Sequence, residues 1–190
     1  MEHTEAIVEL KNAINKTLIE KLIALIDKKS KDKLQINAGA VDQKIKNVLD
    51  KNIRNVNGYH LDFTTPTNVF YWNVIKQEVE RVYALYKAKF PKMKSIKINQ
   101  IDLLKYLPGG KYNIHTDHFT NSPRHLSIII NLNNTYEGGD LIFTDQHEKE
   151  IKRYKLSEGS VIFFPSNFMY PHGIEPITKG TRYSIVAWLQ

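Results

Sequence analysis

The sequence predicts an α+β protein that is mainly β, with helices in its first half and two packed sheets in its second. Helical patterns occupy much of the chain before residue 90, whereas from residue 96 the apolar residues come in short runs separated by turn residues. Eight such runs fit between residues 96 and 189, which suits a jelly roll, the double-stranded β-helix of cupin-like proteins. We therefore expect a jelly-roll core buttressed from outside by N-terminal helices.

A chain of 190 residues is expected to form one domain with a sizeable core. Residues 1–190 would then be a single domain, in which residues 1–95 are helical or irregular support and residues 96–190 form the catalytic core. The apolar fraction of 42% and the charged fraction of 25% are ordinary for a globular protein. The chain contains no cysteine, which excludes disulfides, thiolate metal sites and cysteine nucleophiles. Any metal must be held by nitrogen and oxygen ligands.

Two helices are expected before the strands. In residues 5–28 apolar side chains recur every four residues, with charged residues between them, as in an amphipathic helix. Residues 68–89 carry an apolar and aromatic stripe at helical spacing, and Pro91 follows its end. Residues 29–66 are expected to be irregular, and they either pack on the core or form part of a substrate-facing lid. The two stripes consist of Leu10, Ile14, Leu18, Leu22 and Ile26, and of Tyr71, Ile75, Val79, Val82 and Tyr86.

The predicted strands are separated by turn residues, among them the Gly-Gly pairs at 109–110 and 138–139. No internal repeat or low-complexity tract interrupts them. The strands are expected at residues 96–107, 111–118, 125–133, 140–144, 150–156, 160–164, 170–176 and 181–189.

Positive charge is concentrated in the first half of the chain. Residues 1–98 hold 18 Lys and Arg against 11 Asp and Glu, whereas residues 99–190 hold nine of each. The excess would attract an acidic partner or nucleic acid, or it simply forms solvated helix faces, which we favour. The acidic start of the chain lacks the regions of a secretory signal, and no apolar run has the length of a membrane span. We therefore expect a cytoplasmic protein without a membrane partner.

The candidate metal ligands begin with a His-x-Asp motif. On a strand, His115 and Asp117 would project from the same face, because side chains two residues apart share a face. An imidazole and a carboxylate are two of the three ligands of the 2-His-1-carboxylate triad that holds non-haem Fe(II). His172 is the best candidate for the third ligand, since His118 points away by strand parity and His147 lies in a polar turn.

Arg182 opens the last predicted strand, ten residues after His172. It alternates with Ser184, Val186 and Trp188 onto one face, so that it can point into the jelly roll. An arginine here suits a carboxylate, which its planar fork binds through two hydrogen bonds.

These residues resemble the 2-oxoglutarate/Fe(II)-dependent dioxygenases, and specifically their prolyl 4-hydroxylase-like branch. The resemblance covers residues 99–190, and the N-terminal half carries little of it. Its motifs are residues 106–112 leading into the His-x-Asp, residues 136–141 with their Gly-Gly pair, residues 159–165, and residues 172–184. Bacterial peptidyl hydroxylases are similar around residues 136–141 and 172–182.

The resemblance implies a function and a set of residue roles. His115, Asp117 and His172 would be catalytic metal ligands for Fe(II), and 2-oxoglutarate and O2 would be co-substrates, with ascorbate as a reductant. Decarboxylation of 2-oxoglutarate to succinate and CO2 would drive hydroxylation of an unactivated C–H bond in a peptide, protein or amino acid, most naturally a proline-containing one. The resemblance places Arg182, Tyr106 and Asn131 at the co-substrate and Tyr112 and Trp188 near the substrate. Tyr106, Tyr112 and Trp188 also suit the core.

Three other functions stay open at this point. A nucleic-acid demethylase of the alkylation-repair type would share the triad, but it would carry a second arginine after Arg182, which the chain lacks. A non-catalytic double-stranded β-helix that serves as a binding module would have lost a ligand, and none is missing. A cupin-type metal enzyme without 2-oxoglutarate would not need Arg182. The sequence does not indicate the oligomeric state.

Overall fold

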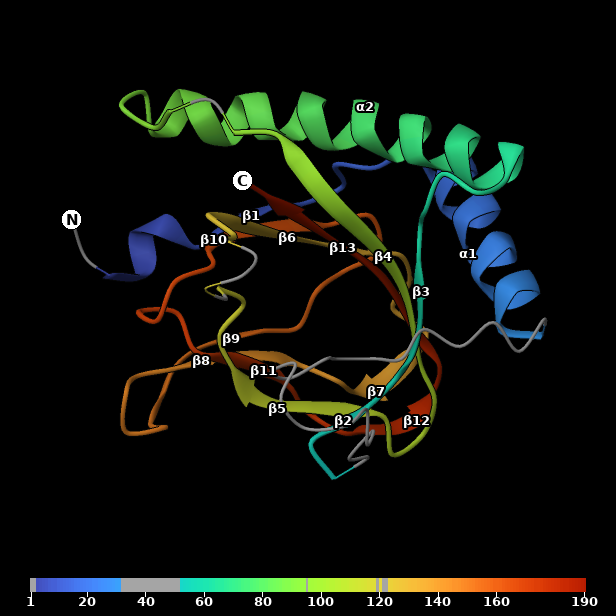
Figure 1. Ribbon diagram of the computed structural model, residues 1–190. Coiled ribbons are helices and arrows are strands. Elements are labelled where there is room, and N and C mark those ends of the chain that lie inside the picture. The colour runs from blue at the N-terminus through green and yellow to red at the C-terminus, as the bar shows by residue number, and fades with distance from the viewer. Residues whose placement is uncertain (1–2, 32–51, 95, 119, 121–122) are drawn as a thin grey trace.

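The structure, a computed structural model, consists of two facing β-sheets with two helices on the outer side of one of them (Figure 1). It describes residues 3–31, 52–94, 96–118, 120 and 123–190. In the described part of the chain, no helix combines the length and the apolar character needed to cross a bilayer.

The larger sheet has six strands and the smaller has five. All the strand pairings are antiparallel, and a two-stranded ribbon completes the arrangement. The six-stranded sheet has the order β1 (Val8–Leu10), β10 (Val161–Pro165), β6 (Leu126–Asn131), β13 (Arg182–Leu189), β4 (Ile98–Tyr106) and β3 (Asn57–His60). The five-stranded sheet has the order β2 (Arg54–Asn55), β5 (Lys111–His115), β11 (His172–Ile174), β8 (Leu141–Thr144) and β9 (Glu150–Tyr154), and the ribbon pairs β12 (Ile177–Gly180) with β7 (Tyr136–Gly138).

This architecture confirms the predicted mainly β jelly roll with N-terminal helices. Each of the eight predicted runs contains a strand. The short strands β7 and β12 were not predicted, because three or four residues that end in a glycine show no clear alternation. Their pairing with each other is what makes them strands.

The first predicted helix begins later than its pattern suggested, so the prediction for residues 5–28 is wrong in its first half. A short 3-10 helix, η1 (His3–Ala6), and strand β1 come first, and α1 spans Lys16–Lys31. Strand β1 pairs with β10, and this long-range pairing overrides the helical spacing. Asn12 then turns the chain with φ of 51°, and the Asn15 side chain accepts a hydrogen bond from the Thr17 amide at the helix start.

The second helix, α2 (Pro66–Lys89), agrees with its prediction. Thr65 caps it by accepting a hydrogen bond from the Asn68 amide, and Pro66 occupies the first turn, where a missing N–H costs nothing. In Figure 1, α2 runs along the upper side, across the strands of the six-stranded sheet.

The prediction that residues 29–66 are irregular is wrong for its first residues, which belong to α1, and for two strand segments. Strand β2 adds to the edge of β5 and strand β3 adds to the edge of β4. With two and four residues, these strands are too short to show a local alternation, and the neighbouring strand supplies the hydrogen bonds. The question of a substrate-facing lid falls mostly on residues 32–51, outside the described residues.

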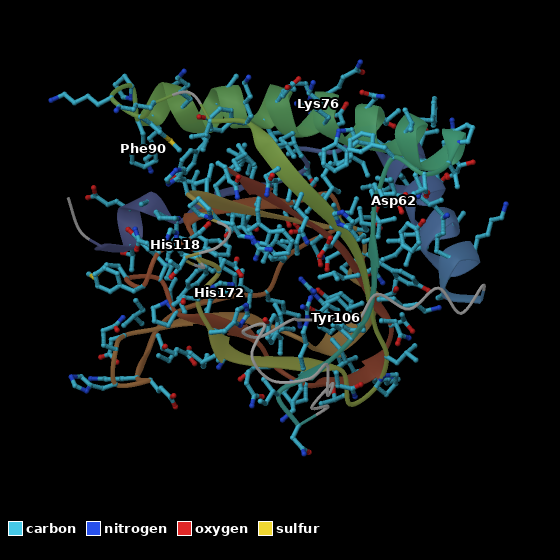
Figure 2. The ribbon with its side chains drawn as sticks, in the orientation of Figure 1. Asp62, Lys76, Phe90, Tyr106, His118 and His172 are labelled. Carbon is cyan, nitrogen blue, oxygen red and sulfur yellow. The ribbon has the colours of Figure 1, made fainter. Side chains whose placement is uncertain are left out.

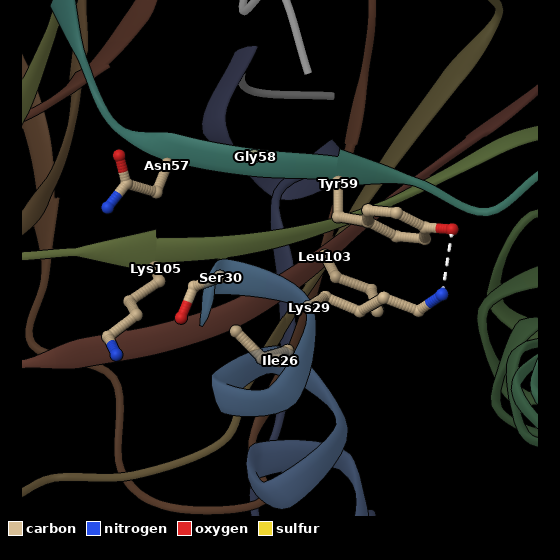
Figure 3. A pocket seen from close by; sticks show the side chains of 8 residues that line it. All are labelled: Ile26, Lys29, Ser30, Asn57, Gly58, Tyr59, Leu103 and Lys105. Carbon is tan, nitrogen blue, oxygen red and sulfur yellow. Dashed lines mark hydrogen bonds between the residues drawn. The ribbon is translucent and has the colours of Figure 1, made fainter. Parts of the chain in front are cut away.

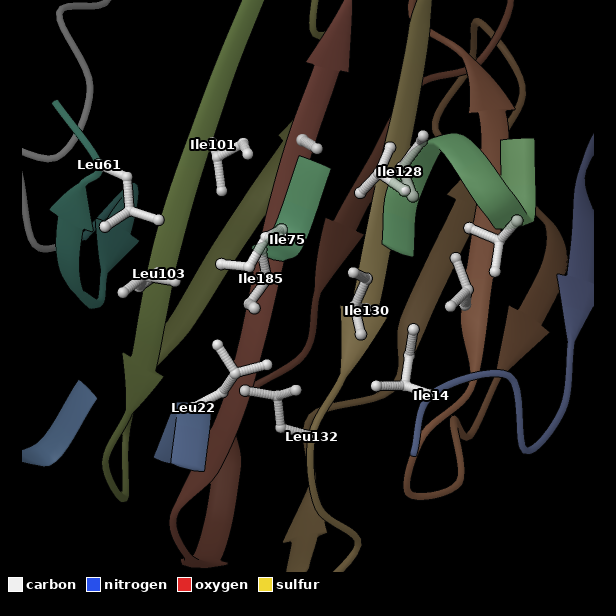
Figure 4. Packing of buried hydrophobic residues seen from close by; sticks show 14 of the residues in the cluster. Ile14, Leu22, Leu61, Ile75, Ile101, Leu103, Ile128, Ile130, Leu132 and Ile185 are labelled. Carbon is white, nitrogen blue, oxygen red and sulfur yellow. The ribbon is translucent and has the colours of Figure 1, made fainter. Parts of the chain in front are cut away.

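The helices and the outer face of the six-stranded sheet share one apolar core (Figure 4). In this core Leu22 of α1 and Ile75 of α2 meet Ile101, Ile128 and Ile185 of the sheet, all at most 1% exposed. Burying each such side chain contributes roughly 1.5–3 kcal/mol. The core therefore fixes the sheet whose other face carries the candidate site.

Candidate active site

The structure brings His115, Asp117 and His172 together between the two sheets, and we refer to these three candidate metal ligands as the metal cluster. His172 of β11 is the direct cross-strand partner of His115 on β5. The Nε2 atoms of His115 and His172 lie 3.4 Å and 3.5 Å from the two oxygens of Asp117, and one potential ligand atom from each residue falls within a 4.8 Å cluster. Figure 2 shows His172 in the space between the two sheets.

Strand parity is not what brings Asp117 to this cluster. Strand β5 ends at His115, and Asp117 lies in the bend that follows. Two residues past the strand end, the bend carries the carboxylate to the same side as the imidazole. The structure therefore brings His115 and Asp117 together as predicted, but the strand geometry assumed for Asp117 was wrong.

Both imidazoles are oriented by backbone carbonyls. Nδ1 of His115 lies 2.8 Å from the Asn113 carbonyl, and Nδ1 of His172 lies 3.0 Å from the Tyr170 carbonyl. Because a carbonyl oxygen only accepts, each Nδ1 must carry the proton, which leaves the lone pair on Nε2. Both lone pairs therefore belong to the nitrogens next to Asp117, as metal-binding histidines require.

Two serines hold the Asp117 carboxylate. The Ser127 hydroxyl donates to Oδ2 of Asp117 over 2.6 Å and lies 2.8 Å from the Ser166 hydroxyl. Since the carboxylate can only accept, the Ser127 hydroxyl donates its hydrogen bond to Asp117 and accepts one from the Ser166 hydroxyl. Neither serine was predicted, although Ser127 interrupts an otherwise apolar strand, which was a signal in the sequence.

The charge states of the cluster suit metal binding at neutral pH. Burial raises the pKa of Asp117, but the imidazoles of His172 and His115 and the Ser127 hydroxyl outweigh it and hold that pKa well below its usual range. Burial lowers the pKa of His172 to about 4, against the opposing effect of Asp117. Asp117 is therefore ionised and His172 is neutral, which are the forms that bind a cation.

Arg182 lies in the same cavity as these three residues. Its side chain is only 1% exposed, and its Nη1 donates to the Ser184 hydroxyl over 3.0 Å. Its Nε and Nη2 have no hydrogen-bond partner among the described residues. A buried guanidinium without a counter-ion is costly, so the cavity has unmet capacity for an anion.

The Gly-Gly pair of residues 136–141 makes room for this arginine. A Cβ at Gly139, which has φ of +68°, would lie 2.3 Å from Cδ1 of Ile177 and 3.3 Å from Cδ of Arg182. A larger residue would therefore push against the buried side chain as well as strain the backbone.

Tyr106 faces Arg182 across the pairing of β4 with β13. The Arg182 guanidinium lies 5.2 Å from the centre of the Tyr106 ring, and both residues line the cavity. Burial raises the pKa of the Tyr106 phenol, against the opposing charges of Arg182 and Arg54. Tyr106 is therefore a protonated hydrogen-bond donor at neutral pH.

Tyr112 and Trp188 also line the cavity. The Tyr112 ring stacks on His115 with ring centres 3.5 Å apart. The Arg124 guanidinium lies 3.8 Å from the centre of the Trp188 ring. Both aromatic residues form walls close to the metal cluster.

Asn131 is the one predicted site residue that the structure places outside this group. Its side-chain amide donates to the carbonyls of Asn133, Leu156 and Ser157, and its Oδ1 accepts from the Tyr136 hydroxyl. These contacts use the amide fully, and Asn131 does not line the cavity. The sequence identified a buried amide that needs partners, but those partners are loop carbonyls.

A second cavity lies on the helix side of the six-stranded sheet, between α1 and strands β3 and β4 (Figure 3). Lys29 donates there to the Tyr59 hydroxyl over 3.0 Å. Lys105 also lines this cavity and pairs with Asp27 at 2.6 Å. Because Lys105 faces away from the metal cluster, it does not compete with Arg182.

Comparison with known proteins agrees with this geometry. Residues 101–190 match the sequence model of the 2OG-Fe(II) oxygenase superfamily. A PKHD-type hydroxylase of Rippkaea orientalis is 29% identical over 125 residues, which are 62% of this chain and 53% of that protein. A PKHD-type hydroxylase of Gloeothece citriformis is 33% identical over 100 residues, which are 50% of this chain and 44% of that protein. The chain thus spans about half the length of these relatives.

Solved structures share the fold over almost the whole chain. A prolyl-4-hydroxylase of Pseudomonas putida has a TM-score of 0.70 at 18% identity, covering 97% of this chain and 92% of that one. A prolyl hydroxylase of Trichoplax adhaerens, in complex with a peptide fragment of the hypoxia inducible factor oxygen degradation domain, has a TM-score of 0.72 at 16% identity, covering 98% and 84%. The predicted resemblance is confirmed: residues 101–190 are similar to the 2OG-Fe(II) oxygenase superfamily, and the chain has the fold of the solved prolyl hydroxylases.

Proposed function

We propose that this chain is an Fe(II)- and 2-oxoglutarate-dependent dioxygenase that hydroxylates an unactivated C–H bond. The observation that carries the proposal is one cavity holding both the His-Asp-His cluster and the buried, partly unpaired Arg182. A metal site alone would suit many proteins, whereas the adjacent buried cation calls for an anionic ligand beside the metal.

The residues fit both groups. Two imidazole nitrogens and one carboxylate oxygen are the ligand set of non-haem Fe(II) proteins that keep open positions. The free Nε and Nη2 of Arg182 suit the far carboxylate of 2-oxoglutarate, because a guanidinium binds carboxylate through two parallel hydrogen bonds. When bound, Fe(II), 2-oxoglutarate and O2 together supply oxidation of a C–H bond, with release of succinate and CO2.

The roles of the chain's own residues follow from their contacts. His115, Asp117 and His172 would hold the metal, with Ser127 fixing the carboxylate. Ser184 would orient Arg182, and the protonated Tyr106 would donate a hydrogen bond to the co-substrate. Tyr112 and Trp188 would form the walls against which the substrate rests, and they would help to exclude water from the reacting centre.

We further propose a peptide or protein substrate with a prolyl target. The support is the fold shared with prolyl hydroxylases, one of which was solved with a peptide. A free amino acid remains the alternative substrate. The single domain of residues 1–190, the cytoplasmic location and the use of ascorbate stay predictions.

The test is to supply Fe(II), 2-oxoglutarate and O2 and to measure succinate together with the mass of proline-containing peptides. We expect succinate formation that requires all three additions, and a peptide mass gain of one oxygen atom. Omission of 2-oxoglutarate is the control. Succinate formation without any peptide gain would refute the prolyl substrate, and the absence of 2-oxoglutarate-dependent succinate would refute the enzyme class.

A further inference from the structure

The cavity contains a second guanidinium that the proposed function leaves without a role. Arg54 of β2 lines the same cavity as the metal cluster and Arg182. Its Cζ lies 4.5 Å from the centre of the Tyr112 ring, and that ring stacks on His115 at 3.5 Å. A single aromatic ring therefore links Arg54 to a member of the metal cluster.

Arg54 has no anionic partner among the described residues. No carboxylate in that part of the chain comes within ion-pair distance of it, and its Nε is buried without a hydrogen-bond partner. Asp117, the one carboxylate among the described residues that line the cavity, accepts a hydrogen bond from Ser127 and faces the two imidazoles with which it would hold the metal. A half-buried guanidinium that faces a cavity without a counter-ion among the described residues has capacity for an anionic ligand.

The cavity is positive enough for a further anion. Two guanidinium groups, those of Arg54 and Arg182, line the cavity against the single carboxylate of Asp117 among the described lining residues. The nearby Arg124 is engaged elsewhere: it donates to Gln100 over 2.9 Å and rests on Trp188. Arg54 is thus, besides Arg182, a cavity-lining guanidinium with capacity for an anion.

The remaining step rests on the proposed function. Of the two carboxylates of 2-oxoglutarate, one would lie beside the metal and the other would pair with Arg182, which leaves none for Arg54. We propose that Arg54 receives a carboxylate of the primary substrate, so that the substrate is an acid. That carboxylate belongs either to a free amino acid or to an acidic side chain next to the hydroxylated residue of a peptide.

The experiment measures binding, so it does not depend on turnover. L-Proline and L-prolinamide form one probe pair, and two acetylated, amidated peptides that differ only in Pro-Glu against Pro-Gln form the other. Each probe is titrated calorimetrically into the anaerobic protein carrying Fe(II) and 2-oxoglutarate. We expect one carboxylate probe to bind at least about tenfold more tightly than its amide, the effect of a charge-assisted hydrogen bond. The pair that shows the preference identifies the source of the carboxylate.

The variants assign the preference to the residue. Arg54→Gln should reduce the ratio to about one, and Arg54→Lys should restore part of it, because lysine returns the charge without the fork. Arg81→Gln is the matched control, since it removes an exposed arginine from α2 and should leave the ratio unchanged. The affinity for 2-oxoglutarate is measured in every variant and should stay within about twofold of wild type.

Three results would overturn the proposal. The first is a wild type that shows no preference for the carboxylate probe over its amide, which includes a wild type that binds no probe. The second is a preference that persists in Arg54→Gln. The third is a loss of 2-oxoglutarate affinity in Arg54→Gln that is as large as the loss of affinity for the probe. Failure of the proposed function gives a different result. It would appear as no 2-oxoglutarate-dependent succinate from the wild type, while the probe titrations, repeated without 2-oxoglutarate, would still report on Arg54.

Discussion

The two faces of the six-stranded sheet carry different kinds of residue, although the same strands build both. On β13, Ile185, Ala187 and Leu189 face the helices and join an apolar core. The alternate residues Arg182 and Ser184 face the other sheet and line the cavity with the metal cluster. The helices cover one face, whereas the other face carries polar side chains, of which Arg182 has donors without a hydrogen-bond partner among the described residues.

This difference shows how one strand can supply stability and chemistry separately. Alternation with period two keeps the two functions apart, because neighbouring residues never share a face. A substitution on the helix side should therefore act on folding, and its neighbour on the cavity side should act on binding. Each of the following predictions tests that separation.

The largest effect is expected for His172→Ala. Removing one of the three proposed ligands should lower Fe(II) affinity and turnover by more than about 100-fold, since even the loss of an outer contact costs 10- to 100-fold. The fold should persist, because the helix-side core is untouched. Metal binding and succinate formation are measured together, with His147→Ala as a control outside the cluster. Wild-type iron binding and turnover in His172→Ala would show that the third ligand is another residue.

Ile185→Ala should produce the opposite result. It empties space in the helix-side core, where Ile185 is fully buried, and should cost about 2–5 kcal/mol of unfolding free energy. The affinity for 2-oxoglutarate should not change. Denaturant unfolding and co-substrate titration measure the two effects, and Val186→Ala, one residue along on the cavity side, is the matched control. A change in affinity for Ile185→Ala greater than that for Val186→Ala would contradict the separation.

Arg182→Ala should weaken 2-oxoglutarate binding by about two orders of magnitude. The variant loses the charge-assisted hydrogen bonds to the far carboxylate of 2-oxoglutarate and leaves that carboxylate buried without a partner. Fe(II) affinity should barely change, because no ligand is lost, and Arg182→Lys should recover part of the binding. Succinate formation against 2-oxoglutarate concentration is the measurement. Unchanged affinity would mean that the anion is held elsewhere, with Lys111 or Arg124 as the next candidates, and simultaneous loss of iron would make Arg182 a structural residue.

The smallest effect is expected at the edge of the cavity-side face, where His60 lies 2.9 Å from Asp102. The hydrogen bond to Asp102 raises the pKa of His60 above 6.5, although burial opposes it. The pair should stabilise the fold fully below the unfolded pKa, and this stabilisation should fade as the pH rises through the raised folded value.

The size of this effect is limited by solvent. The His60 side chain is 47% exposed, so the difference should stay below about 1 kcal/mol. Unfolding free energies of wild type and His60→Gln, compared between about pH 6 and pH 9, give the measurement. A wild-type advantage that grows with rising pH would have the wrong sign and refute the assignment.

The sequence by itself determined the class of fold and much of the candidate site. Short apolar runs with glycine turns and an apolar stripe at helical spacing are local signals, and they were enough to predict eight strands and the second helix. The His-x-Asp motif, the distal His172 and Arg182 were recognisable because their order along the chain is distinctive. Tyr106, Tyr112 and Trp188 were also identified, although the sequence left open whether they belonged to the core or to the site.

The tertiary structure decided what depends on partners far away in the chain. Residues 8–10 became a strand, against their helical spacing, because β10 offers them hydrogen bonds. The Asn131 side-chain amide donates to loop carbonyls instead of lining the cavity, and Asp117 joins the metal cluster from a bend beyond its strand. Arg54 joined the cavity through the pairing of β2 with β5. In each case the physical reason is the same: local pattern fixes which face a side chain takes, whereas long-range pairing fixes what that face meets.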